Sequence, residues 1–128
     1  MTVANKTSMR QDISTEDLNK LIIGGILDLK GKDIIQLNLK ALEEASTDYF
    51  IICHGESHTQ VNAIADHIIG QIKKKTDLVP FHMEGRKNAN WVLIDYFDTV
   101  VHIFYKETRD FYKLENLWSD AELTSHES

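Results

Sequence analysis

Two aspartates and two aromatic residues stand together in the stretch Asp95-Tyr96-Phe97-Asp98, between two apolar segments. Two carboxylates on one turn can hold Mg²⁺ or Ca²⁺, although such cations usually take more oxygen ligands than these two. Aspartate also favours tight turns by hydrogen-bonding to the backbone. A turn cannot bury both rings within its own domain, and exposed aromatic rings beside acids are typical of an interface. Metal binding, turn formation and recognition of a basic partner are therefore all open at this position.

The stretch Gly55-Glu56-Ser57 precedes an apolar pattern with helical spacing. Free N–H groups at a helix start attract anions, so a phosphate site is one interpretation. Glu56 opposes an anion, and the segment has no glycine-rich phosphate loop. Ser57 followed three residues later by Gln60 matches a capping box. The sequence thus favours a helix cap over a phosphate cradle.

The thiol and imidazole side chains form no recognisable catalytic or metal-binding pattern. The histidines in the region expected to fold are scattered, and none pairs with cysteine or a carboxylate at zinc spacing: His54, His58, His67, His82 and His102. His102 alternates with apolar neighbours, which is typical of a core histidine. Cys53 lies in an apolar run, where thiols are usually inert, and as the single cysteine it excludes an internal disulfide. The sequence predicts a non-enzymatic protein without a cofactor, in the cytosol.

Residue periodicity predicts the elements that must position these side chains. Apolar residues recur at helical spacing after Ser14 up to residue 29, and again after Ser57 up to residue 75. Alternating or continuous apolar residues predict strands at 35–39, 49–53, 91–94 and 99–104, and an edge strand at 79–83 because it contains Pro80. From Lys106 onward the pattern is helical, with Phe111, Leu114 and Trp118 on one buried face.

The predicted order of elements is α-β-β-α-β-β-β-α. A strand, a helix and a further strand imply a right-handed parallel crossover, whereas the flanking hairpins imply antiparallel pairs. We therefore expect an α/β (α+β) fold with a mixed five-stranded sheet and helices packed against it. The expected organisation is a flexible N-terminus at 1–13, a single domain at 14–118 and a disordered polar tail at 119–128.

Composition limits the classes of partner. The 128 residues carry a formal net charge of −6, and residues 91–128 hold most of the acidic excess. Bare nucleic acid is an unsuitable primary partner, because phosphate binding needs a basic face. A basic partner suits this charge better. No apolar run approaches the length needed to span a membrane.

Several separated motifs, in order, resemble the Iojap family of ribosomal silencing factors. The motifs are 28–34 (DLKGKDI), 46–52 (STDYFII), 63–67 (AIADH), 84–85 (EG), 91–95 (WVLID), 98–102 (DTVVH), 107–109 (ETR), 111–112 (FY), 114–115 (LE) and 117–118 (LW). The resemblance extends from about Leu18 to Trp118. Phe97 departs from the family, which usually has glycine there, as does His54, where a small or hydroxyl residue is common.

The resemblance implies a fold related to nucleotidyltransferases, without the paired Asp-x-Asp of the active members. It implies a factor that binds the large ribosomal subunit through its fourteenth protein, blocks small-subunit joining when nutrients are scarce, and forms a homodimer. Ribosomal proteins are generally basic, so an acidic, aromatic face can steer association. The competing class is a nucleotidyltransferase-like enzyme or nucleotide-binding protein. The expected partner-binding residues are Asp48, Glu84, Trp91, Asp95, Tyr96, Asp98 and His102.

Overall fold

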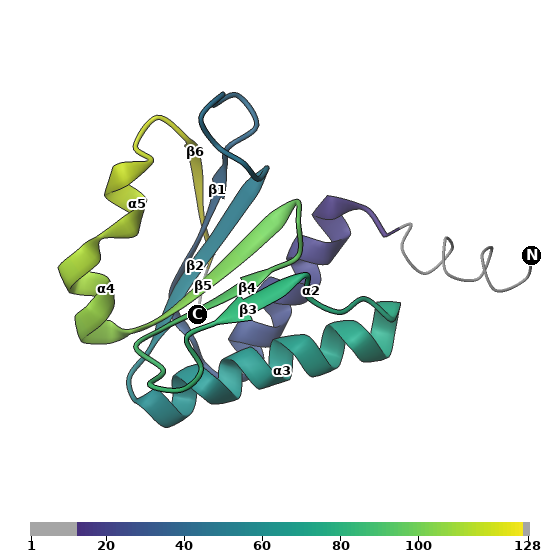
Figure 1. Cartoon of the computed structure of the whole chain (residues 1–128), viewed down its shortest axis with the longest axis vertical. Coiled ribbons are helices and arrows are strands. Elements are labelled where there is room, and N and C mark those ends of the chain that lie inside the picture. The colour runs from purple at the N-terminus through teal and green to yellow at the C-terminus, as the bar shows by residue number, and fades with distance from the viewer. Residues whose placement is uncertain (1–12, 127–128) are drawn as a thin grey trace, which may run out of the picture.

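The chain folds into one six-stranded mixed sheet with helices on both faces, as seen in a computed structural model that describes residues 13–126 (Figure 1). The elements in chain order are α2 (Thr15–Asp28), β1 (Lys32–Asn38), β2 (Tyr49–Gly55), α3 (His58–Thr76), β3 (His82–Glu84), β4 (Trp91–Asp95), β5 (Thr99–Tyr105), α4 (Lys106–Tyr112), α5 (Leu114–Leu117) and β6 (Glu122–His126). The strands lie in the order β3-β4-β5-β2-β1-β6. The expected α/β class and the expected order of the first eight elements are confirmed.

The parallel pair β2 and β5 lies at the centre of the sheet, and all other strand pairs are antiparallel. Every residue from Tyr49 to Gly55 pairs in register with a residue from Thr99 to Tyr105. Both strands are nearly all buried, as the continuous apolar run at 49–53 predicts for a strand covered on both faces.

Helices α2 and α3 cover one face of the sheet. Ser14 and Ser57 begin them as predicted, because each hydroxyl oxygen accepts a hydrogen bond at 3.0 Å from the backbone N–H three residues later. The two helices pack closely at Gly25, where an added Cβ would lie 3.2 Å from the Ile68 side chain. The larger core cluster forms here, between these helices and residues such as Ile51 and Val101.

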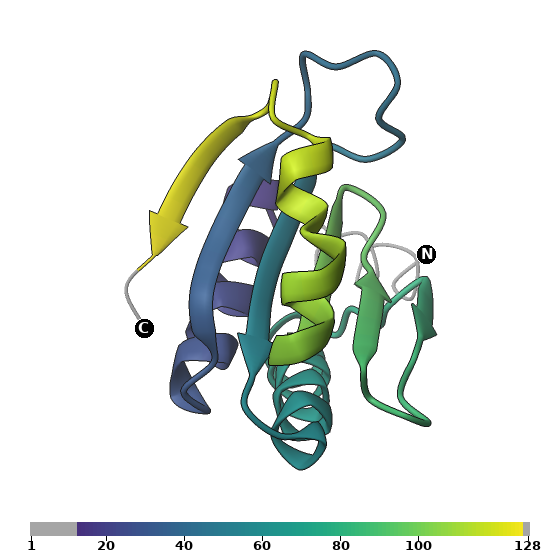
Figure 2. The same ribbon diagram turned by 90° about the vertical axis from the view of Figure 1, so that its left-hand side faces the viewer.

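The opposite face is covered by α4 and α5, which lie over the middle of the sheet (Figure 2). Leu114 and Trp118 pack with Ile52 and Phe104 in a second, smaller core cluster. Lys113 separates the two short helices and adopts a left-handed backbone conformation, with φ 48°. Sequence periodicity predicted continuous helix here and did not detect this break.

Two expectations about the C-terminal part were wrong. Glu122–His126 forms β6 on the edge of β1, so the sheet has six strands rather than five and the predicted disordered tail is ordered at these residues. Phe111 is 80% exposed rather than buried, because the break at Lys113 places it on a different side from Leu114.

The edge strand predicted at 79–83 forms instead at His82–Glu84, after Pro80. The N-terminal residues 1–12 lie outside the described residues.

Candidate docking surface

Strand register places four of the seven predicted partner-binding residues on one face of the sheet. Glu84 pairs with Leu93, which pairs with His102, and Trp91 and Asp95 lie two residues to either side of Leu93 on the same strand. Paired residues, and residues two apart on a strand, point to the same face. That face is opposite α2 and α3, because the alternate residues Val92 and Ile94 belong to the core beneath those helices.

The part of this face on β3 and β4 is accessible, and we refer to it as the open face: His82, Glu84, Trp91, Leu93 and Asp95. His82 and Glu84 are exposed, and the three residues on β4 are half-buried. The helices α4 and α5 lie over β2 and β5 instead (Figure 2). The open face combines an indole, a leucine side chain and two carboxylates, which together suit a partner with both apolar and basic groups.

Trp91 is held by contacts on several sides. Its Nε1 donates a hydrogen bond to Nδ1 of His102 at 3.0 Å, and its ring lies 4.7 Å from Phe104 and 5.2 Å from Tyr112, measured between centroids. These contacts fix the orientation of the indole at the edge of α4. A fixed aromatic side chain loses little conformational entropy on binding, which suits an interface anchor.

His102 is only 4% exposed, which confirms the prediction of a core histidine. Desolvation lowers its pKa to about 3, so the ring is neutral at physiological pH. Its Nε2 has no hydrogen-bond partner among residues 13–126. His102 therefore lies beneath the open face and orients Trp91. Its expected role changes from direct contact with the partner to positioning of the Trp91 ring.

The two aromatic residues of the turn after β4 differ in burial. Tyr96 is 9% exposed and lies in the larger core cluster, so the interpretation of Tyr96 as an exposed interface ring was wrong. Its side chain continues the alternation of Val92 and Ile94, so it points to the face that α2 and α3 cover. Phe97 is 67% exposed and adopts φ 80°. The turn thus buries one of its two rings and exposes the other.

The aspartates of this turn make defined contacts. Asp95 Oδ1 accepts a hydrogen bond from the backbone N–H of Phe97 at 2.7 Å, which confirms the turn-forming interpretation for Asp95. Asp98 Oδ2 accepts one from the Thr15 hydroxyl at 3.3 Å. The Asp98 carbonyl oxygen accepts from the backbone N–H of Asp48 at 3.0 Å, so these two acidic residues lie together where β2 begins.

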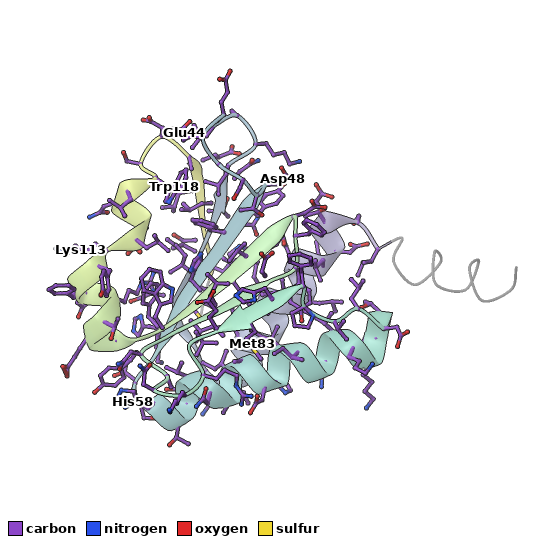
Figure 3. All side chains as sticks on the ribbon, in the orientation of Figure 1. Glu44, Asp48, His58, Met83, Lys113 and Trp118 are labelled. Atoms are coloured by element: carbon purple, nitrogen blue, oxygen red, sulfur yellow. The ribbon has the colours of Figure 1, made fainter. Side chains whose placement is uncertain are left out.

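Asp48 and His58 mark the two ends of the parallel strand pair (Figure 3). Near His58, the capping box occupies the backbone N–H groups of Glu56 and Gln60, which a bound anion would need as donors. Gln60 donates its backbone N–H to Ser57, while its Oε1 accepts from the Glu56 backbone N–H at 2.7 Å. The capping interpretation is confirmed, and the phosphate interpretation loses these donors.

Arg109 is a buried residue that sequence reasoning missed. It is 6% exposed, and its Nη1 lies 3.0 Å from Nδ1 of His54. Desolvation, followed by the charge of Arg109, lowers the pKa of His54. Burial of an arginine depends on neighbours distant in sequence, so no local pattern predicts it. Leu93 and Tyr112 were also missed, although strand alternation could have placed Leu93 beside Glu84 and His102.

A metal-binding cluster and a membrane-spanning helix are both absent from residues 13–126. No group of three His, Cys, Asp or Glu side chains within residues 13–126 is arranged to hold a metal ion. In the same part of the chain, no helix is long and apolar enough to cross a bilayer.

Comparison with known proteins identifies the family. Residues 12–128 match the family model described as "Ribosomal silencing factor during starvation". The chain belongs to this family of ribosomal silencing factors. The family resemblance suggested by the sequence motifs is thereby confirmed.

Relatives in the ribosomal silencing factor family span almost the same length. The ribosomal silencing factor of Bacillus subtilis is 40% identical over 87% of this chain and 92% of its own length. That of Halalkalibacterium halodurans is 39% identical over 85% and 92%. A crystal structure of a protein from Chromobacterium violaceum is 34% identical, covers 84% of this chain and 88% of its own, and superposes with a TM-score of 0.78.

Proposed function

We propose that this protein binds the large ribosomal subunit through its fourteenth protein and sterically blocks joining of the small subunit when nutrients are scarce. The activity is non-enzymatic and takes place in the cytoplasm. Membership in the ribosomal silencing factor family supports ribosome association. A bound protein that occupies the joining surface represses translation by occlusion alone, so no catalytic group or cofactor is required.

The open face carries this proposal. On this face Leu93 lies between Trp91 and Asp95 along β4, and Glu84 lies beside Leu93 on β3. Apolar side chains supply most of the binding free energy in such interfaces, whereas flanking acids speed encounter with a basic protein and fix its orientation. Asp48 and Asp98, at the start of β2, add negative charge along the approach rather than an apolar contact.

The test compares two double variants in which both changes introduce lysine. Glu84→Lys with Leu93→Lys alters the open face, while Glu44→Lys with Leu27→Lys makes the same change in charge elsewhere, at exposed residues. Like charges placed against a basic surface cost several kcal/mol in binding. The open-face variant should bind free large subunits at least about 100-fold more weakly in co-sedimentation and should no longer lower the yield of joined ribosomes.

The matched control should bind within about twofold of the parent protein. Equal binding by both double variants would move the docking surface away from the open face. Equal joining of subunits with and without saturating parent protein would instead reject the silencing function itself. These two failures are separate because the second needs no variant.

Two further proposals from the sequence can be tested in the same preparations. A homodimer is expected, and sedimentation equilibrium of the purified chain measures it. The alternative function, nucleotide binding, predicts that a ligand at 100 times its Kd stabilises the fold by about 2.7 kcal/mol. An unchanged melting temperature with nucleotide and Mg²⁺ would contradict that alternative.

A further inference from the structure

A pocket of about 780 Å³ lies next to the open face, between α4, the start of α3 and the loop that joins β3 to β4. We refer to it as the aromatic pocket. The residues that line it include His58, Asn90, Trp91, Tyr105, Glu107 and Tyr112. Trp91 lines the pocket and also belongs to the open face, so the pocket adjoins the open face.

The loop wall depends on Gly85. Its φ is 91°, and an added Cβ would lie 1.9 Å from the carbonyl oxygen of Trp91. Only glycine allows this approach of the loop to β4. The Asn90 carbonyl oxygen then accepts a hydrogen bond from the Tyr105 backbone N–H at 2.9 Å, which ties the loop to the end of β5.

Aromatic rings form the remaining walls. The Trp91 and Tyr112 centroids are 5.2 Å apart, and Phe111 meets Tyr112 edge-on at 5.0 Å. On the other side His58 stacks on Tyr105 at 4.1 Å, with its Nε2 2.9 Å from Asn90 Oδ1. Phe111 and Tyr112 line the pocket, yet both side chains are exposed to solvent. Their rings therefore lie at the mouth of the pocket.

Helix α4 separates its charges between two sides. Lys106 and Arg109 line a different pocket, where Lys106 pairs with Asp110 at 2.9 Å and Arg109 lies 3.6 Å from a Glu115 oxygen. Glu107 faces the aromatic pocket together with Phe111. Among the described residues that line this pocket, lysine and arginine do not occur, and Glu107 supplies the carboxylate.

We propose that the aromatic pocket binds an arginine side chain of a basic protein partner. A guanidinium group stacks on indole and phenol rings through cation–π attraction, and it pairs with a carboxylate through two parallel hydrogen bonds. The pocket supplies both features, from Trp91 and Tyr112 and from Glu107. The inference rests on the proposed function, because it assigns the basic partner's arginine to a defined place beside the open face.

A nucleobase would also find rings to stack on and asparagines to bond. Its phosphate groups, however, would lie near the Glu107 carboxylate without a lysine or arginine from the pocket lining. A cation therefore suits the pocket better than a nucleotide does.

The test uses the intact protein with three probes: an acetyl-Gly-Arg-Gly-amide peptide, the same peptide with citrulline in place of arginine, and AMP. Citrulline has the shape of arginine without its charge. Tryptophan fluorescence reports binding, and Trp118→Phe assigns the signal to Trp91, since Trp118 instead packs on Phe50. The arginine peptide should bind at least fivefold more tightly than either of the other probes.

Glu107→Gln should weaken the arginine peptide at least fivefold, while Glu122→Gln, on the exposed strand β6, should leave its affinity unchanged. Equal binding of the citrulline peptide, tighter binding of AMP, or an unchanged affinity in Glu107→Gln would each overturn the inference. Peptide binding needs no ribosome, so its failure is distinct from a failure of the parent protein to bind large subunits. If the peptide binds but large subunits do not, the pocket stands and the ribosomal partner is wrong.

Discussion

The indole N–H of Trp91 donates a hydrogen bond to Nδ1 of His102, across the antiparallel pair β4 and β5. An indole nitrogen can only donate, so Nδ1 must be the unprotonated nitrogen and Nε2 carries the hydrogen. Protonation of Nδ1 would remove the acceptor and place a charge in a buried site. The orientation of Trp91 on the open face thus depends on a neutral His102.

This relationship predicts a pH-dependent loss of stability. The folded-state pKa of His102 is about 3, against about 6.5 in the unfolded chain, so below pH 6.5 the unfolded state takes up a proton that the folded state does not. Above pH 6.5 the His102 ring is mostly neutral in both states, so its titration hardly affects the free energy of unfolding. Its contribution to the free energy of unfolding should fall by about 2 kcal/mol between pH 7 and pH 5, and continue to fall towards pH 3.

Urea unfolding at pH 7 and pH 5 measures this loss, with His102→Gln as the comparison. Glutamine keeps an acceptor for Trp91 but does not titrate. The difference in stability between the two pH values should be about 2 kcal/mol smaller in the variant, whatever its absolute stability. An identical pH dependence in both proteins would mean that His102 is not a buried neutral group.

Phe97 lies in the left-handed region, with φ 80°, where side chains are unfavourable. Phe97→Gly and Phe97→Ala both remove the stacking of the exposed ring on Phe81, whose centroid is 4.8 Å away. They differ in that alanine keeps the strain. We expect the glycine variant to be more stable than the alanine variant by about 1 kcal/mol in thermal or urea unfolding. An alanine variant of equal or greater stability would show that the turn changes its backbone when the ring is lost.

Cys53 is predicted to be inert in the folded protein. Desolvation raises the pKa of its thiol to about 12, and the opposing effect of Arg109 is smaller. At pH 8 the thiolate fraction is lower than that of an ordinary cysteine by roughly a thousandfold. Labelling with a chromogenic disulfide reagent should be slower by at least roughly that factor in native buffer than in guanidinium chloride. Complete labelling of the folded protein within minutes would contradict this burial.

Phe111 and Phe104 should differ strongly when truncated. Phe104 is fully buried, so Phe104→Ala should lower the free energy of unfolding by about 3–5 kcal/mol. Phe111 is exposed, and Phe111→Ala should change stability by less than about 0.5 kcal/mol. Parallel urea unfolding of both variants decides the matter. A large loss in Phe111→Ala would return Phe111 to the core that the sequence pattern had suggested.

The elements that sequence reasoning located were those with local signals. Ser14 and Ser57 each satisfy a nearby backbone N–H, and the apolar run at 49–53 needs burial on both faces wherever it lies. The strand β6 carries no such signal. Its residues other than Leu123 are polar, most of them are exposed, and the strand pairs with β1, which is distant in sequence.

The candidate site shows the same division between local and distant information. The sequence predicted Trp91, Asp95 and Glu84 as partner-binding residues, and strand register places these three on one face. It misplaced Tyr96, because the turn was treated as exposed although alternation from Val92 carries that ring inward. Arg109 and the break at Lys113 depend on tertiary contacts and on one left-handed residue, and neither has a local signature.

The pairing of β6 with β1 joins segments from opposite ends of the described chain, as in the partners Ile34 and His126. A chain that ended before residue 122 would leave β1 as the edge strand, with a row of unpaired backbone groups along seven residues. Such an edge can recruit strands from other molecules. During synthesis β6 is made about 90 residues after β1, so a nascent chain carries this unpaired edge until residues 122–126 have left the ribosome.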